Sequence, residues 1–165
     1  MKRLLRDTRG NALVGLAFLL PIMLGLSFGI LEFSVLIFDF HRANEATRRI
    51  ARQAAMVAPL VDQATLINNG SATCTGTGCA NLAELTAVAK SAFPKIAPEN
   101  VAITYSLTDI GNDLPVGFLR KPLITVRITG LQHDFLLFNG LAGVPKSLTF
   151  PPLTTSTLGR WFEPS

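Results

Sequence analysis

Residues 11–31, NALVGLAFLLPIMLGLSFGIL, form an apolar stretch that contains no charged side chain. As an α-helix with a rise of about 1.5 Å per residue, this stretch would be about 31 Å long, which matches the hydrocarbon thickness of a bilayer. A helix in the core of a soluble protein rarely needs an apolar surface on every side over that length. The stretch therefore predicts a transmembrane helix.

The charges on either side of the stretch predict its orientation. Residues 1–10, MKRLLRDTRG, hold four basic residues and one acidic residue. Beyond the stretch the nearest charges are acidic, at Glu32 and Asp39, and the first basic residue is Arg42. Because basic residues resist translocation, we expect residues 1–10 to be a basic cytoplasmic leader and the C-terminal part to lie outside. The alternative is a cleaved signal peptide, but its apolar core is only about 7–15 residues long and ends in a small-x-small site, which is not evident after Leu31.

Three residues inside the stretch favour contact with another helix. Pro21 removes a backbone donor, so we expect a kink there, which a membrane tolerates where a neighbouring helix covers it. Gly25 and Gly29 form a small-xxx-small pair, whose missing side chains let a second helix approach closely. The sequence therefore predicts that Pro21, Gly25 and Gly29 serve helix bending and packing.

Glu32 interrupts a longer apolar stretch, because the uncharged residues 33–38 follow it. As one helix, residues 11–38 would be about 42 Å long, which exceeds the hydrocarbon core. Either Glu32 lies at the level of the outer headgroups, or the helix slides and places the carboxylate inside the membrane, where an unpaired charge is costly. This cost favours a carboxylate at the membrane interface; the alternative is a carboxylate that pairs with another subunit.

From Asp39 onward the pattern becomes that of an amphipathic helix. Mostly small, apolar residues recur at spacings of three and four, and Pro59 is a stop signal. We expect one helix over about residues 10–58, with the transmembrane part at 11–38 and an amphipathic continuation at 39–58. Its apolar stripe is expected to pack against the protein's own outer domain and consists of Ala43, Thr47, Ile50, Ala54 and Val57.

The remaining residues, 59–165, are expected to form a small outer domain. Residues 68–78 are rich in Gly and Asn and predict a loop, whereas residues 132–144 are ambiguous. The fold class is therefore predicted to be α+β, with the long helix packed on a small antiparallel sheet. Within the outer domain, the patterns predict a helix at 80–93 and strands at 101–107, 123–129 and 153–158.

The net charge of +4 belongs to the N-terminal part of the chain. Residues 1–52 carry eight Lys or Arg and four Asp or Glu, whereas residues 53–165 carry seven of each kind. The outer domain is thus close to neutral, and its charge does not indicate a nucleic-acid partner. The sequence also lacks a P-loop, a G-x-S-x-G motif and an H-E-x-x-H motif. We expect no enzymatic activity, no cofactor, no nucleic acid and no small-molecule substrate.

Two cysteines, Cys74 and Cys79, enclose a short loop of Thr and Gly. Such a loop closes a disulfide without much strain, whereas a redox-active pair is more often C-x-x-C. A zinc site needs more ligands, and His41 and His133 lie far away without ligand spacing. A structural disulfide is favoured and requires an oxidising compartment, in agreement with an outer domain outside the cytoplasm. The alternative is two free thiols in a cytosolic loop.

The N-terminal third combines several features of one known family. A short basic stretch ends in Arg9-Gly10-Asn11, the apolar stretch contains Leu20-Pro21, residues 29–33 read GILEF, and the helical pattern continues through residues 46–55. Together they resemble TadE-like proteins, which are minor pilins or pseudopilins of the tight-adherence (Flp, type IVb) pilus system. The resemblance covers about residues 9–58. It implies a pilin-like fold and a non-enzymatic role in pilus assembly and surface adhesion, in the bacterial inner membrane with a periplasmic domain.

The resemblance also implies partners. These are other pilin or pseudopilin subunits, the Tad secretion and assembly machinery, and a prepilin peptidase that would cut between Gly10 and Asn11. Processed prepilins usually carry Glu as the fifth residue after the cut, where this chain has Gly15. Glu32 does not replace that residue, because it lies about 25 Å further along the helix.

The alternative function is a single-pass membrane-anchored extracytoplasmic binding or structural module unrelated to pili.

Overall fold

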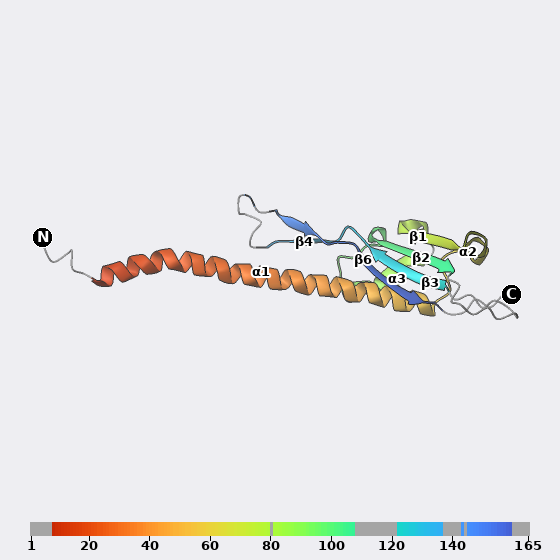
Figure 1. The fold of residues 1–165 in the computed structure, drawn as a ribbon, viewed down its shortest axis with the longest axis horizontal. Helices are drawn as coiled ribbons and strands as arrows, with labels where there is room; N and C mark the ends of the chain where they lie inside the picture. Colours follow the sequence, from red (N-terminus) through yellow and green to blue (C-terminus); the bar gives the residue numbers. More distant parts are fainter. Residues whose placement is uncertain (1–7, 80, 108–121, 137–142, 144, 160–165) are drawn as a thin grey trace.

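The computed structural model describes residues 8–79, 81–107, 122–136, 143 and 145–159. One long helix, α1 (Thr8–Met56), carries a small α+β domain on its C-terminal part, and its N-terminal half extends away from that domain (Figure 1). The helix continues through Pro21 without a break and ends close to Pro59, which cannot donate a backbone hydrogen bond. The predicted α+β class, with a long apolar helix followed by a small antiparallel sheet, is confirmed.

The main sheet has four antiparallel strands in the order β1-β2-β3-β6. The central pair, β2 and β3, corresponds to two of the predicted strands, and in both of them alternate side chains are buried. Ile103 lies opposite Val126, and Tyr105 lies opposite Ile124, so the buried side chains of the two strands form one apolar face. The strands extend over Ser71–Thr75 (β1), Val101–Leu107 (β2), Pro122–Ile128 (β3) and Leu153–Leu158 (β6).

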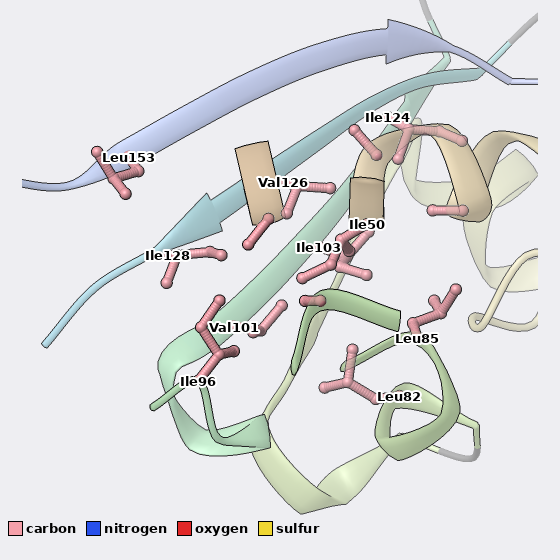
Figure 2. Packing of buried hydrophobic residues seen from close by; sticks show 14 of the residues in the cluster. Ile50, Leu82, Leu85, Ile96, Val101, Ile103, Ile124, Val126, Ile128 and Leu153 are labelled. Atoms are coloured by element: carbon pink, nitrogen blue, oxygen red, sulfur yellow. The ribbon is translucent and has the colours of Figure 1, made fainter. Parts of the chain in front are cut away.

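Small residues of α1 cover this apolar face. Ala43, Ala46, Thr47 and Ala54 are fully buried or nearly so, and the larger Ile50 fills the centre of the core (Figure 2). The Thr47 hydroxyl donates to the carbonyl of Ala43 over 2.9 Å, so it enters the core without an unsatisfied donor. Packing of the predicted stripe against the protein's own domain is thus confirmed for four of its five residues.

The fifth residue of the stripe, Val57, was predicted wrongly. Its side chain is 38% exposed, because α1 ends at Met56 and the chain turns away before Pro59. The helical periodicity therefore holds as far as the helix does, and one residue past its end the side chain no longer faces the sheet.

Helix α3 (Leu82–Lys90) closes the core from the other side. Leu82, Leu85 and Ala89 point into the core, at the spacing of three and four that one helix face requires (Figure 2). This helix is shorter than the predicted helix at 80–93, although the buried residues Ala92 and Phe93 continue the contact after it. Two single-turn 3₁₀ helices flank it, at Gly76–Gly78 (η2) and Pro98–Asn100 (η3).

The prediction of a loop over residues 68–78 is wrong in part. Residues 71–75 form β1, which pairs with β2 in an antiparallel register from Ser71↔Ser106 to Thr75↔Ala102. Just before it lies the short helix α2 (Gln63–Asn69), which Asp62 caps by accepting from the backbone N–H of Thr65. Its C-terminal Gly70 adopts a φ of 71°, a left-handed conformation that glycine takes without strain.

A second, two-stranded ribbon resolves the ambiguity for residues 132–136, whereas residues 137–142 and 144 of the ambiguous segment lie outside the described residues. Strand β4 (Gln132–Asp134) pairs with β5 (Ser147–Thr149), and the ribbon lies beside α1 and points toward its N-terminal end (Figure 1). We refer to the described residues of this ribbon and its ends, 131–136 and 145–150, as the arm, and to Leu136, the last described residue after β4, as its tip.

Candidate functional site

The N-terminal half of α1 presents an apolar surface to its surroundings on all sides. Every described side chain from residue 12 to 28 is exposed, and within the described part of the chain this is the one helix long and apolar enough to cross a membrane. Ser27 and Ser34 donate their hydroxyls to the carbonyls of Met23 and Ile30, four residues earlier, so both polar groups are satisfied inside the helix. These features suggest a single-pass membrane anchor.

Of the residues predicted to bend and pack the anchor, Pro21 and Gly25 are exposed. An added Cβ at Gly15 or Gly25 would meet no atom within 4 Å, so nothing else in the described chain requires glycine at these two positions. Gly29 is half-buried. Pro21 lies inside the continuous helix. The roles of Pro21, Gly25 and Gly29 toward a second helix remain predictions.

Glu32 has a partner that the sequence did not indicate. Its side chain is 4% exposed, and the backbone N–H of Leu136 donates to the carboxylate over 2.6 Å. The two residues are 104 positions apart in the chain and meet because the arm extends along α1. The carboxylate is therefore bonded and covered by the protein's own arm. Its predicted location at the membrane interface remains a prediction.

Two helical turns further on, Asp39 contacts a second residue of the arm, His133. The Asp39 carboxylate lies 2.9 Å from Nδ1 of His133, whose side chain is 4% exposed. The other ring nitrogen of His133, Nε2, is buried and has no hydrogen-bond partner among the described residues. The ring of Phe135 packs edge-on against the imidazole, with centroids 5.5 Å apart. Asp39 and His133 thus form a buried polar contact between α1 and the arm.

The base of the arm is held by apolar packing. The rings of Phe40 and Phe150 meet edge-on with centroids 5.7 Å apart, and the N–H of Phe150 donates to the carbonyl of Leu131 over 2.8 Å. Glu32, Leu36, Phe40 and Ala43 follow one another at spacings of four and three, so they lie on one face of α1. The arm covers this face, whereas residues 33–35, 37, 38 and 41 of the same turns are exposed.

Three arginines of α1 bind either the outer domain or an acidic residue of the same helix. Arg42 donates from Nε to the carbonyl of Ala92 over 2.7 Å and lies 5.5 Å from the ring centroid of Phe38. Glu45 pairs with Arg49 at 3.1 Å and with Arg52 at 3.2 Å. The hydrogen bond from Arg49 is the main reason that the pKa of Glu45 lies below its usual value.

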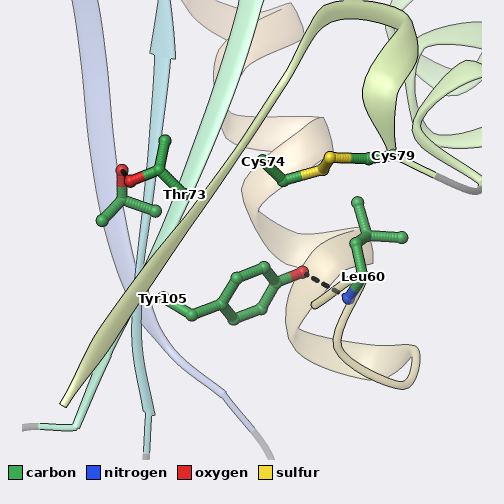
Figure 3. The surroundings of a disulfide bond; sticks show 6 residues. Leu60, Thr73, Cys74, Cys79 and Tyr105 are labelled. Carbon is green, nitrogen blue, oxygen red and sulfur yellow. Dashed lines mark hydrogen bonds between the residues drawn. A yellow bond between two sulfur atoms is a disulfide. The ribbon is translucent and has the colours of Figure 1, made fainter. Parts of the chain in front are cut away.

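The disulfide predicted from the short loop is present. Cys74 in β1 is bonded to Cys79, and their Cα atoms are 5.9 Å apart (Figure 3). Cys74 is fully buried, so the bond ties the edge strand to the start of α3 through η2. Nearby, the hydroxyl of Tyr105 accepts from the backbone N–H of Leu60 over 3.4 Å (Figure 3), and burial raises the pKa of this hydroxyl.

The described residues show few features of a metal-binding or ligand-binding site. They include no group of three or more His, Cys, Asp or Glu side chains that could hold a metal ion. A pocket of about 240 Å³ lies between the end of α1 and α3, and Glu84 is the one charged side chain that lines it. The volume is smaller than that of usual ligand pockets, about 300–1,000 Å³. The candidate functional surfaces of the described chain are the exposed half of α1 and the arm beside it.

The predicted cleavage position lies at the start of α1. Gly10 and Asn11 belong to the first turns of the helix, whereas residues 1–7 of the basic leader lie outside the described residues. Gly15, which occupies the position where processed prepilins carry Glu, follows one turn later on the exposed surface.

Comparison with known proteins agrees with the sequence resemblance. Residues 10–52 match the family model described as TadE-like protein. The match begins at the predicted cleavage position and ends within the buried stripe of α1, so it covers both the exposed and the packed halves of this helix. Neither the curated proteins nor the solved structures include a significant match to this chain.

Proposed function

We propose that this protein is a non-enzymatic minor pilin or pseudopilin that takes part in the assembly of a Tad pilus and thereby in surface adhesion. The observation that carries the proposal is the match of residues 10–52 to TadE-like proteins, on a helix whose N-terminal half is apolar and exposed. A TadE-like protein is pilus-associated. This role accounts for a long exposed apolar helix in a chain whose described residues include no cluster that could hold a metal ion.

The proposed location is the bacterial inner membrane, crossed once by α1. Residues 1–10 would lie in the cytoplasm, because the basic residues before the apolar stretch resist translocation. The domain beyond residue 39 would lie in the periplasm, where the disulfide between Cys74 and Cys79 forms and persists.

The proposed mechanism is helix packing in the bilayer. Within a membrane, small residues let backbones approach, and Gly15, Gly25 and Gly29 supply them on a helix surface that its own domain leaves largely open. Other pilin or pseudopilin subunits and the Tad assembly machinery are the proposed partners of this surface.

Processing of the leader is part of the proposal. A prepilin peptidase would cut between Gly10 and Asn11, and α1 would then begin close to its new N-terminus. Mass spectrometry of the protein purified from its own host tests this step. The expected mature chain begins at Asn11, whereas a chain that still begins at Met1 in cells with an active peptidase contradicts processing.

Gene deletion tests the pilus role. We expect cells without this protein to form few or no pili, and the wild-type gene to restore them. Leu24→Arg, which places a charge in the middle of the exposed apolar helix, should fail to restore them, because a charged residue at the centre of a bilayer is costly. The matched control is Ile67→Arg, on an exposed position of α2, which should restore pili. Normal pili in the deletion strain would contradict the pilus role and favour an anchored module of another kind.

A further inference from the structure

We propose that the arm is a second membrane contact, whose tip at Leu136 rests in the outer interfacial layer of the bilayer that α1 crosses. The occupant of this surface is lipid, and the arm sets how far α1 enters the membrane. The inference rests on the proposed membrane anchoring by α1, and its test separates the two claims.

The position of the tip follows from the length of the anchor. Residues 12–31 are free of charge and would extend about 30 Å as a helix, which is the thickness of the hydrocarbon core. Glu32 therefore comes at the outer boundary of that core. Because the N–H of Leu136 donates to the Glu32 carboxylate over 2.6 Å, the tip of the arm lies at the same level.

The side chain at the tip fits an apolar environment. Leu136 is 79% exposed, more than any other large hydrophobic side chain among those described. Its surroundings in the sequence carry no charge between Asp134 and Lys146. On the neighbouring turns of α1, Phe33 and Phe38 are about as exposed as the side chains of the anchor itself. Exposed apolar side chains of α1 therefore lie at and beyond the level of the tip of the arm.

Two polar groups at this level, the Glu32 carboxylate and the backbone N–H of Leu136, bond each other and can therefore be partly removed from water. A carboxylate at the edge of the hydrocarbon core is costly when it has no donor, and here Leu136 supplies one. The same bond satisfies a backbone N–H beyond the end of β4, which lipid could not satisfy.

The arm carries two fully charged residues: Asp134 pairs with Lys95 of the outer domain at 3.3 Å, and Lys146 lies next to the tip, where its carbonyl accepts from the N–H of Phe135. An exposed ammonium beside the tip suits the headgroup layer, where lysine side chains reach polar lipid groups.

A protein partner fits this surface less well than lipid does. Stable protein interfaces bury about 800 Å² on each partner around a cluster of large side chains. Among the described residues of the arm, the exposed large hydrophobic side chains are Leu136 and Leu148. A bilayer needs no matching surface, so one leucine next to the end of an apolar helix is sufficient for contact.

Tryptophan placed at three levels tests the inference in the full chain, reconstituted into phosphatidylcholine vesicles that contain brominated lipid. In a background in which Trp161, the chain's one tryptophan, is replaced by Phe, the variants are Phe18→Trp in the anchor, Leu136→Trp at the tip and Ile67→Trp on α2. All three positions are exposed, so the substitutions leave the core intact. Circular dichroism and the intact disulfide confirm folding of each variant.

We expect Phe18→Trp to lose most of its fluorescence to bromines deep in the acyl chains. Leu136→Trp should be blue-shifted and quenched more by bromines near the headgroups than by deep ones. Ile67→Trp should emit as in water and stay unquenched. If Leu136→Trp behaves like Ile67→Trp while Phe18→Trp is quenched, the arm is not a membrane contact although the anchor inserts. If Phe18→Trp is also unquenched, α1 does not insert into the bilayer, and both the proposed anchoring and the inference are wrong.

Dilution of the protein in lipid decides between lipid and a second copy of the chain. Quenching of Leu136→Trp by brominated lipid should be independent of the protein-to-lipid ratio. A blue shift that vanishes on dilution and is accompanied by no quenching would overturn the inference in favour of a contact between copies.

Discussion

The two halves of α1 are one continuous helix, yet they are built for different surroundings. In residues 12–31 large apolar side chains point outward on every side, whereas in residues 43–54 a narrow stripe of mostly small residues is buried against a sheet. The second half can be buried by its own domain, since Ala lets the sheet approach closely. The first half finds no such cover in the described chain, and its surface requires lipid or another helix. The difference shows that burial must be judged from side-chain size and spacing together, because both halves are apolar.

The strongest test of this contrast is the same substitution in both halves. Ile50→Ala removes a fully buried side chain and should lower the free energy of unfolding of the outer domain by about 2–5 kcal/mol. Ile30→Ala, at a position that is 68% exposed, should leave that free energy unchanged. Urea unfolding of the full chain in detergent, followed by near-UV circular dichroism, measures both. Equal effects would contradict the division of α1 into two halves.

The disulfide should stabilise the outer domain and have no effect on anchoring of α1 in the membrane. Replacing Cys74 and Cys79 by Ser opens a short loop and should lower the free energy of unfolding by about 2 kcal/mol, through the greater freedom of the unfolded chain. The same unfolding experiment measures the loss, and retention of the protein in the carbonate-washed membrane fraction is the matched readout for the anchor. Loss of membrane retention would show that the two halves are more tightly coupled than the structure indicates.

The contact between α1 and the arm lies at the junction of the two halves. Asp39→Asn removes the charge that faces the buried His133 and should weaken the arm locally by about 1–2 kcal/mol. Hydrogen exchange at residues 132–136 is expected to accelerate, while exchange in β2 and β3 stays slow, because their hydrogen bonds lie in the main sheet. Faster exchange across the whole sheet would indicate that the arm supports the outer domain rather than α1 alone.

The smallest effect concerns the one tyrosine of the chain, Tyr105. Because burial raises the pKa of its hydroxyl above 10.0, folding stabilises the protonated form. The contribution is complete below pH 10 and is lost as the pH rises through the higher pKa of the folded state. Absorbance of tyrosinate near 295 nm should therefore appear at higher pH in the folded than in the urea-unfolded protein. Coincident titrations would contradict the burial of this ring in the core.

The sequence was sufficient where structure follows from local periodicity. The long helix, its buried stripe and the alternating strands β2, β3 and β6 each have a pattern that a few consecutive residues reveal. The prediction of a buried side chain was wrong at Val57, because the pattern does not indicate at which residue the helix ends.

What the sequence did not reveal depends on partners far away in the chain. Strand β1 forms in a segment whose Gly and Asn residues predicted a loop, because β2 supplies its hydrogen bonds. The contacts from Glu32 to Leu136 and from Asp39 to His133 join residues about a hundred positions apart, and no local pattern encodes them. One signal was available, since a carboxylate inside an apolar stretch needs a donor, but nothing in the sequence identified Leu136.

Topology is the most direct test of the central claim, that the exposed half of α1 crosses the membrane and the domain it carries lies outside the cytoplasm. The measurement is the activity of alkaline phosphatase, which folds only in the periplasm, fused to the C-terminal end of the full chain, compared with a cytoplasm-specific reporter at the same place. We predict an active phosphatase and an inactive cytoplasmic reporter. The reverse pattern would contradict the claim.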